Sequence, residues 1–383
     1  MSLSLFMLFG GCGREPADTT DALSDLFPIH PSPEAVTSQD DWTAAISPRA
    51  FAFPADHGAH EDYRIEWWYY TGNLEAEDGS RFGYQLTFFR TGLNKETNNP
   101  SKWAVRDLYT AHFAISDLGS RQHYCFQRNS RRGTGQAGAE VGHYAVWNGD
   151  WKAWMDGENH RLQAGESETR IDLTLSPKKS LVLHGDNGLS QKGSMVGNAS
   201  HYYSFTRLLT EGTIRIDGVD FRIQGSSWMD HEFSTSFLEP GQLGWDWFSI
   251  QLDNGIDLML YRMRRKDGTT DPFSSGSVVR KDGQLTHLSA TEFRLTPLRN
   301  WTSSATGAAY PLDWNVEIPG LGYQLAVTSA FDRQEMTTND TTGINYWEGA
   351  IEITGNSEEG RVTGRGYMEL TGYAGQGLGA LFD

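Results

Sequence analysis

The chain has 383 residues, more than one ordinary core holds, so two domains are expected. It carries 32 Lys and Arg against 49 Asp and Glu, and this net charge of −17 excludes nucleic acid as an expected partner, because phosphate backbones are repelled. Two cysteines exclude a disulfide framework and a multi-cysteine metal site, while 42 glycines with 13 Trp, 15 Tyr and 19 Phe favour β-structure.

The first residues are typical of a targeting signal. Residues 1–12 begin with the apolar run MSLSLFMLFGG and end at Cys12, and a polar tether follows over residues 13–50. An apolar stretch that ends in small residues before a cysteine resembles the lipobox of bacterial lipoproteins, whose cysteine is acylated. This resemblance implies a lipoprotein-type signal, attachment to the membrane surface through acylated Cys12, and a cell-envelope location as a periplasm-facing lipoprotein or a secreted protein. An ordinary frayed N-terminus is the alternative.

Apolar and polar residues alternate through much of the chain. Residues 82–88, 171–175 and 323–327 are examples, and this alternation is typical of half-buried strands. Between such runs, hairpin turns are indicated by Asp-Gly or Asn-Gly pairs at 78–79, 187–188, 217–218, 254–255, 267–268 and 282–283. Strands at this spacing predict a meandering barrel or a sandwich.

The chain also repeats itself. The pattern E-G-x-I-x-I-x-G occurs at residues 211–218 and again at 348–355. A second pattern, glycine, any residue, small, aromatic, Met and acid, follows at 225–230 and again at 364–369. Two matched blocks in the same order predict two copies of one β-domain.

Each copy begins with a cluster of aromatic residues. The first copy opens with EWWYY at residues 66–70, and the second with WDWF at residues 245–248. Pro240-Gly241 predicts a turn between the two copies. We therefore expect one domain over residues 51–238 and a second over residues 239–383.

Four longer motifs resemble a known family. EWWYYTGNL (66–74), SWMDHEF (227–233), GWDWFSIQL (244–252) and GRGYMELTGY (364–373) look like the AttH-like proteins of bacteria, a group similar to the carotenoid 1,2-hydratases and to fungal lipocalin-like pericyclases. The resemblance implies an all-β fold of two tandem lipocalin-like (calycin) β-barrels packed together. It also implies a surface for long apolar molecules such as lipids, isoprenoids and polyenes.

The activity that the resemblance implies is less uniform. The hydratases rely on a His-x-Trp motif and a later Tyr-x-Asp motif, whereas this chain has His231-Glu232-Phe233 and Tyr261-Arg262-Met263. The first hypothesis is therefore a lipid- or isoprenoid-binding protein of the cell envelope with a role in lipid handling. The alternative is a cofactor-free hydratase, isomerase or cyclase that acts on an isoprenoid or polyene. A purely structural envelope component is the third hypothesis.

Asp230 and His231 are the candidate catalytic residues. On a strand, Asp230 and Glu232 share one face and His231 takes the other, which is poor geometry for a metal, so no metal is expected. No P-loop or dinucleotide-binding motif occurs in the sequence, so no cofactor is expected either. A general acid–base pair is one interpretation. A structural hydrogen-bond network is favoured over it, because Glu369 occupies the position of Asp230 in the second copy.

Aromatic and polar residues near these motifs are the candidate ligand-binding residues. We expect the domain interface and the pocket mouth to share the aromatic clusters, with Asp230 or His231 nearby. Ordinary core packing is the competing interpretation for each aromatic ring and for His112, and pairing with a cation is the commoner fate of a buried acid such as Glu66. The candidates are Glu66, Trp68, Tyr70, His112, Tyr202, Trp245 and Trp247.

Overall fold

The computed structural model describes residues 42–95, 101, 105–236 and 238–375. The predicted signal over residues 1–12, Cys12 and most of the predicted tether lie outside the described residues. The described residues contain strands and two short 3₁₀ turns, η3 (Ala55–His57) and η4 (Pro319–Leu321), but no α-helix. Among them, no helix has the length and apolar character needed to cross a membrane.

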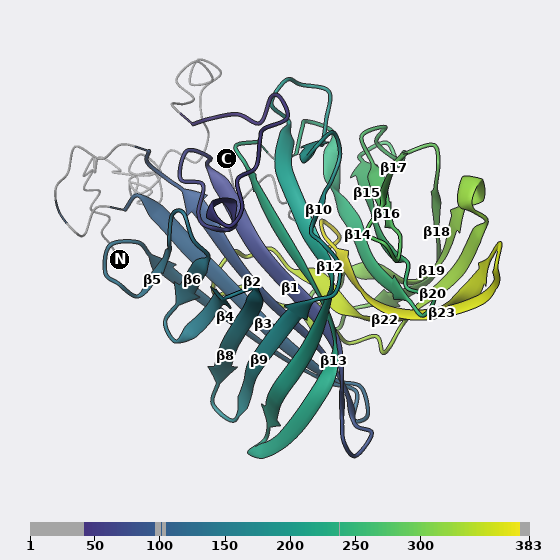
Figure 1. The fold of residues 1–383 in the computed structure, drawn as a ribbon, viewed down its shortest axis with the longest axis horizontal. Coiled ribbons are helices and arrows are strands. Elements are labelled where there is room, and N and C mark those ends of the chain that lie inside the picture. Colours follow the sequence, from purple (N-terminus) through teal and green to yellow (C-terminus); the bar gives the residue numbers. More distant parts are fainter. Residues whose placement is uncertain (1–41, 96–100, 102–104, 237, 376–383) are drawn as a thin grey trace, which may run out of the picture. The chain divides into compact units, whose positions relative to one another are not determined.

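The first sheet contains thirteen described strands, which Figure 1 draws in purple to teal. Its hydrogen-bonded order is β4 (Gln122–Arg131), β3 (Asp107–Asp117), β2 (Arg81–Gly92), β1 (Ile65–Ala76), β13 (Val219–Ser234), β12 (Ala199–Ile216), β9 (Thr169–Pro177), β8 (Asn159–Glu166), β7 (Trp151–Asp156), β6 (Ala145–Asn148) and β5 (Ala137–Ala139). The short strands β10 (Val182–Leu183) and β11 (Leu189–Gln191) also pair with β12.

The second sheet contains ten described strands, drawn in green to yellow (Figure 1). Its order is β17 (Leu285–Ser289), β16 (Ser275–Val279), β15 (Asp257–Arg265), β14 (Gln242–Leu252), β23 (Gly360–Leu370), β22 (Tyr346–Ser357), β20 (Tyr323–Ser329), β19 (Ala309–Ile318) and β18 (Arg294–Thr302), with β21 (Glu335–Met336) on β22. The first sheet ends at Ser234 and the second begins at Gln242. The predicted boundary between 238 and 239 falls in this connection and stays a prediction.

Both sheets curl into near-barrels, as the two-barrel fold predicted from the sequence requires. In the first sheet, β4 at one end lies against β5 and β6 at the other, and Arg128 of β4 donates to the Asn148 carbonyl of β6 over 3.2 Å. Large rings fill both interiors: Trp68 and Trp151 are fully buried in the first core, and Trp314 and Trp347 in the second. Side chains therefore occupy the spaces in which a single small barrel holds a ligand.

The alternation of β1 divides its aromatic cluster between two faces. Trp68 and Tyr70 point into the first barrel core, whereas Trp67 and Tyr69 belong to a separate cluster that includes Trp247 of the second sheet. Because successive side chains on a strand point to opposite faces, a run of four rings serves both the barrel interior and the contact with the other sheet.

The sequence repeat is only partly in register. Asp230 faces Tyr69 on the opening strand of the first sheet, and Glu369 faces Trp247 on the opening strand of the second, so these acids hold equivalent positions as predicted. The first repeated block does not correspond in the same way. Glu348 faces Glu369, whereas its sequence counterpart Glu211 faces Gln224, six residues before Asp230. The pattern E-G-x-I-x-I-x-G therefore identified related strands but the wrong register.

Candidate active site between the two sheets

A cavity of about 210 Å³ lies between the two sheets. Strands β1, β2, β3, β12 and β13 line it from the first sheet, and β14, β15, β22 and β23 line it from the second. Its aromatic lining residues are Trp67, Tyr69, Phe89, Tyr202, Trp245, Trp247, Tyr261 and Tyr346. Carboxyl groups from both sheets also face this largely apolar space, which is the arrangement expected of a ligand or active site.

Asp230 contributes a carboxyl group that accepts three hydrogen bonds. Tyr202 Oη donates to Oδ2 over 2.9 Å, and Trp228 Nε1 donates to Oδ1 over 2.6 Å. Ser204 Oγ also donates to Oδ1. Burial raises the pKa of Asp230 to about 7, and these three donors oppose the rise because they stabilise the carboxylate. Asp230 can therefore exchange a proton near neutral pH.

A buried histidine extends this network away from the pocket. His184 Nε2 lies 2.7 Å from Ser204 Oγ, and His184 Nδ1 lies 2.8 Å from Ser277 Oγ on the second sheet. Burial lowers the pKa of His184 to about 3, so the ring is neutral. Because Ser204 gives its proton to Asp230, its oxygen accepts from Nε2–H and the Ser277 hydroxyl donates to Nδ1. Every donor in this series of hydrogen bonds, from Ser277 through His184 to Ser204, is directed toward the Asp230 carboxylate.

Glu348 and Glu369 face each other across β22 and β23. Tyr69 Oη donates to Glu348 Oε1 over 2.8 Å, and Trp245 Nε1 donates to Glu369 Oε1 over 3.1 Å. Within the described residues, Glu348 Oε2 has no hydrogen-bond partner. Burial raises the pKa of Glu348 well above its ordinary value and that of Glu369 to about 8, and each acid is further disfavoured as an anion by neighbouring carboxylates. Glu348 therefore holds its proton at neutral pH.

An ion pair lines another part of the cavity. Lys192 Nζ lies 3.1 Å from Glu232 Oε1 and stands 4.3 Å from the ring centre of Tyr261 and 5.0 Å from that of Tyr202. Burial opposes its charge, but the Glu232 carboxylate outweighs burial and raises the pKa of Lys192. Lys192 is thus a fixed cation, not a neutral amine that could act as a nucleophile.

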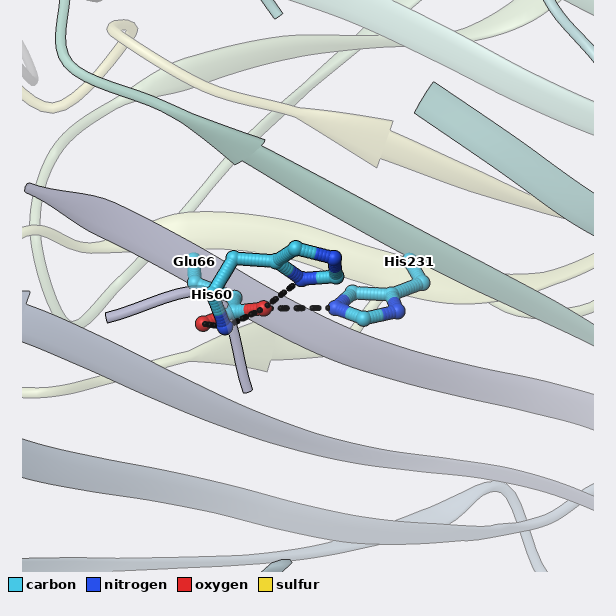
Figure 2. Close-up of side chains that lie close together, drawn as sticks. All are labelled: His60, Glu66 and His231. Carbon is cyan, nitrogen blue, oxygen red and sulfur yellow. Dashed lines mark hydrogen bonds and ion pairs between the residues drawn. The ribbon is translucent and has the colours of Figure 1, made fainter. Parts of the chain in front are cut away.

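A different cluster surrounds His231 on the opposite face of β13 (Figure 2). Glu66 Oε1 accepts from His60 Nδ1 over 2.9 Å and from His231 Nε2 over 2.8 Å, and Arg90 Nε donates to Glu66 Oε2 over 3.2 Å. Burial alone raises the pKa of Glu66, but these hydrogen bonds and the charges of His60 and Arg90 outweigh it and lower the pKa well below its ordinary value. The cluster is an ion-pair network inside the first barrel.

The donor atoms of His60, Glu66 and His231 lie within 4.8 Å of one another, close enough to hold a metal ion. Their hydrogen bonds argue against one. His60 Nε2 donates to Asp56 over 3.0 Å, and hydrogen bonds to Asp56 and Glu66 raise the pKa of His60 although burial opposes its charge. An imidazolium and the Arg90 guanidinium therefore already supply positive charge, and a further cation would be repelled.

His112 lines the cavity as a neutral, hydrogen-bonded ring. Its Nδ1 lies 2.8 Å from Tyr346 Oη, and its Nε2 lies 3.3 Å from Thr341 Oγ1. Burial lowers the pKa of His112 to about 3. His112 thus shapes the pocket wall and carries no charge at neutral pH.

The predicted site residues fall into two groups. Those that line the inter-sheet cavity are Asp230, His112, Tyr202, Trp245 and Trp247. Those that lie within the first barrel are His231, Glu66, Trp68 and Tyr70. The structure therefore separates Asp230 from His231, because adjacent residues of a strand point to opposite faces.

The candidate residues named from the sequence left out Trp67 and Tyr69, although the aromatic cluster that contains them was expected at the cavity, and they also left out Lys192 and Glu348. The alternation of side chains along a strand could have identified Trp67 and Tyr69, since residues 67 and 69 point to the opposite face from residues 66, 68 and 70. For Glu348, the signal was an acid beside Trp347 at the head of an apolar alternating run. No sequence signal distinguished Lys192.

Residues 44–373 match the AttH-like family. The crystal structure of an AttH protein from Nitrosomonas europaea is 34% identical and superposes with a TM-score of 0.78, over 86% of this chain and 99% of that one. The family resemblance inferred from the four motifs is thereby confirmed.

Two curated relatives are enzymes. Kievitone hydratase from Fusarium solani subsp. phaseoli is 24% identical over 218 residues, which span 55% of this chain and 59% of the relative. The dehydratase asqC from Emericella nidulans is 22% identical over 283 residues, which span 70% of this chain and 77% of the relative. Their names agree better with the enzymatic alternative predicted from the sequence than with a lipid carrier.

Proposed function

The chain belongs to the AttH-like family, and on that premise we propose that it is a cofactor-free enzyme that adds water to, or removes water from, an apolar substrate in the inter-sheet cavity. One observation carries the proposal: a protonated carboxyl group with an unpartnered oxygen, Glu348, shares an apolar cavity with Asp230, whose pKa is near 7. Two carboxyl groups whose environments separate their pKa values can act as acid and base.

In the hydration direction, Glu348 Oε2 gives its proton to one carbon of the alkene. The electron pair of the double bond forms the new C–H bond, and the positive charge develops on the adjacent carbon. Trp67, Trp245 and Trp247 line the cavity, and their aromatic rings can stabilise that cation. Water then attacks the cation and Asp230 takes the proton that water loses.

In the dehydration direction the same groups act in reverse. Protonated Asp230 gives its proton to the substrate hydroxyl, which leaves as water, and the Glu348 carboxylate takes the proton from the adjacent carbon so that the double bond forms. The Tyr202, Trp228 and Ser204 hydrogen bonds support Asp230 as the base of the hydration step, because donors stabilise its ionised form. After each hydration a proton must return from Asp230 to Glu348, directly or through solvent.

The test is a mass-spectrometric screen for products that gain or lose one water, with isoprenoid, polyene and prenylated phenol substrates. Glu348→Gln should lower the rate by about 100-fold or more while substrate binding persists, because the amide keeps the shape but loses the transferable proton. Glu352→Gln is the matched control, since Glu352 lies on the same strand but pairs with Arg81 outside the cavity. Equal activity of the two variants would contradict the proposal.

A lipid or isoprenoid carrier is the second candidate, and the aromatic lining of the cavity favours it. A carrier requires no group that moves a proton. It is the better description if apolar ligands quench tryptophan fluorescence saturably, Trp245→Ala weakens that binding, and no substrate gains or loses water.

A further inference from the structure

Four large apolar side chains are exposed at one edge of the inter-sheet cavity. Leu93 lines the cavity and is 48% exposed. Met195 is 51% exposed and Val196 is 90% exposed, and both belong to the loop that directly follows the lining residue Lys192. Ile46, which is 63% exposed, completes the set. We call Ile46, Leu93, Met195 and Val196 the apolar rim.

The segment 42–46 connects the parts of this rim. The Trp42 ring packs against Gly92, and the carbonyl of Thr43 accepts a hydrogen bond from Thr235 Oγ1. At the other end, a Cβ placed on Gly197 would lie 3.1 Å from the Ala44 Cβ and 3.7 Å from Ile46 Cγ2. The segment therefore runs from the end of β2, past the end of β13, to the loop that carries Met195 and Val196.

These contacts place the rim at the mouth of the cavity. Thr91, Ser234 and Ser236 line the cavity, and they are sequence neighbours of the residues that the segment 42–46 touches. Beside the rim lie side-chain types that are enriched where membrane meets water: Lys95 Nζ stands 5.8 Å from the centre of the half-buried Trp42 ring.

We propose that the apolar rim docks on a lipid bilayer, so that an apolar ligand passes between the membrane and the cavity without crossing water. Isolated exposed apolar side chains are ordinary, but several that gather around the mouth of an apolar cavity are suited to contact with lipid. The chain reaches this surface at Trp42, 30 residues after Cys12 and the apolar run that precedes it. The proposed lipid anchor and the cavity mouth would then face the same membrane.

Vesicle flotation tests the proposal with the full chain carrying Cys12→Ser, which removes the anchor and leaves the rim. The probe is vesicles of phosphatidylcholine. Ile46→Asp with Val196→Asp should reduce vesicle-bound protein at least about tenfold, because two carboxylates resist transfer into the interface. The matched control is Val219→Asp with Leu298→Asp, two other exposed apolar residues, of which Val219 lies at the hairpin end of β13, away from Ser234. Circular dichroism should show equal folding of all variants.

The proposal is supported if the Cys12→Ser protein floats with phosphatidylcholine vesicles and only the rim substitutions abolish this binding. The proposal is overturned if the Cys12→Ser protein stays in solution with phosphatidylcholine vesicles, if it floats only with anionic vesicles, or if the rim and control variants float equally. It is also overturned if the rim substitutions abolish a dimer seen by sedimentation, since a second copy would then cover this surface. None of these outcomes depends on the water-transfer reaction, so that function can fail while the rim proposal stands.

Discussion

Two clusters of buried carboxyl groups lie on either side of the first sheet, one inside the first barrel and one in the inter-sheet cavity. Their pKa values shift in opposite directions. Glu66 in the first barrel and Glu348 in the inter-sheet cavity are 0% and 1% exposed, so burial disfavours both anions. Glu66 accepts hydrogen bonds from two histidines and Arg90, which outweigh burial, whereas Glu348 accepts one hydrogen bond, from a tyrosine hydroxyl, and meets no cation among the described residues. The partners, not the burial, separate a carboxylate that stabilises the fold from a carboxyl group that stores a proton.

The largest effect is expected from neutralising each acid in turn. Within the described part of the chain, Glu66→Gln leaves the buried Arg90 guanidinium with Asp107 as its one anionic partner, and it should lower the free energy of unfolding by about 3 kcal/mol. Glu348→Gln should instead raise it by about 3 kcal/mol at pH 7, because folding requires Glu348 to take up a proton that the unfolded chain releases at its ordinary pKa of 4.5, whereas Gln requires none. Urea denaturation at neutral pH measures both. Equal losses would show that the two clusters do not differ as described.

The pH dependence of stability should also differ between the clusters. Glu369 has a pKa of about 8 when folded against an ordinary value of 4.5, so its protonated form favours folding below 4.5, and this contribution is lost as the pH rises toward 8. Between those limits the slope is about 1 kcal/mol per pH unit for one such group. Glu66 has a lowered pKa, so its contribution is present above 4.5 and is lost as the pH falls further.

Denaturation curves at several pH values test this contrast. Glu369→Gln should flatten the dependence between pH 5 and 8, and Glu66→Gln should flatten it only in acid. The contrast is wrong if either variant changes the slope in the other's range.

A smaller effect is expected along the hydrogen-bond chain behind Asp230. His184→Phe removes the donor to Ser204, so the chain that stabilises the carboxylate ends one step earlier, and the pKa of Asp230 should rise above 7 by about one unit. Infrared titration of the carboxyl stretch, assigned with Asp230→Asn, measures it. His112→Phe is the control, because His112 lines the same cavity but bonds to Tyr346. An unchanged Asp230 pKa in His184→Phe would remove His184 from this network.

The smallest effect is expected from metal ions. Zinc or a chelator should move the thermal midpoint by less than about 1 °C, since binding in the Glu66 cluster would have to displace the His60 proton and overcome Arg90. Calorimetry with and without zinc checks this. A zinc-dependent rise that His60→Ala abolishes would make the cluster a metal centre instead.

Part of this site was accessible from the sequence. The repeat of Asp230 at Glu369 is visible in the sequence, but it favours structural roles there, because an acid present in both copies is easily attributed to the fold. The structure places both equivalent acids in one cavity, since the two sheets present matching faces to each other. A duplicated acid can thus belong to one site.

Composition, period-two alternation and the repeated motifs were enough to predict two copies of one β-domain, because the direction of a side chain on a strand depends only on residue parity. The choice of two barrels came from the resemblance to the AttH-like family. Parity also determined that Asp230 and His231 point apart. It could not show which face of β1 is the barrel interior, since both faces carry aromatic rings. Only the tertiary structure brings Tyr69 to Glu348, 279 residues away, and so decides which buried acids meet cations and which keep their protons.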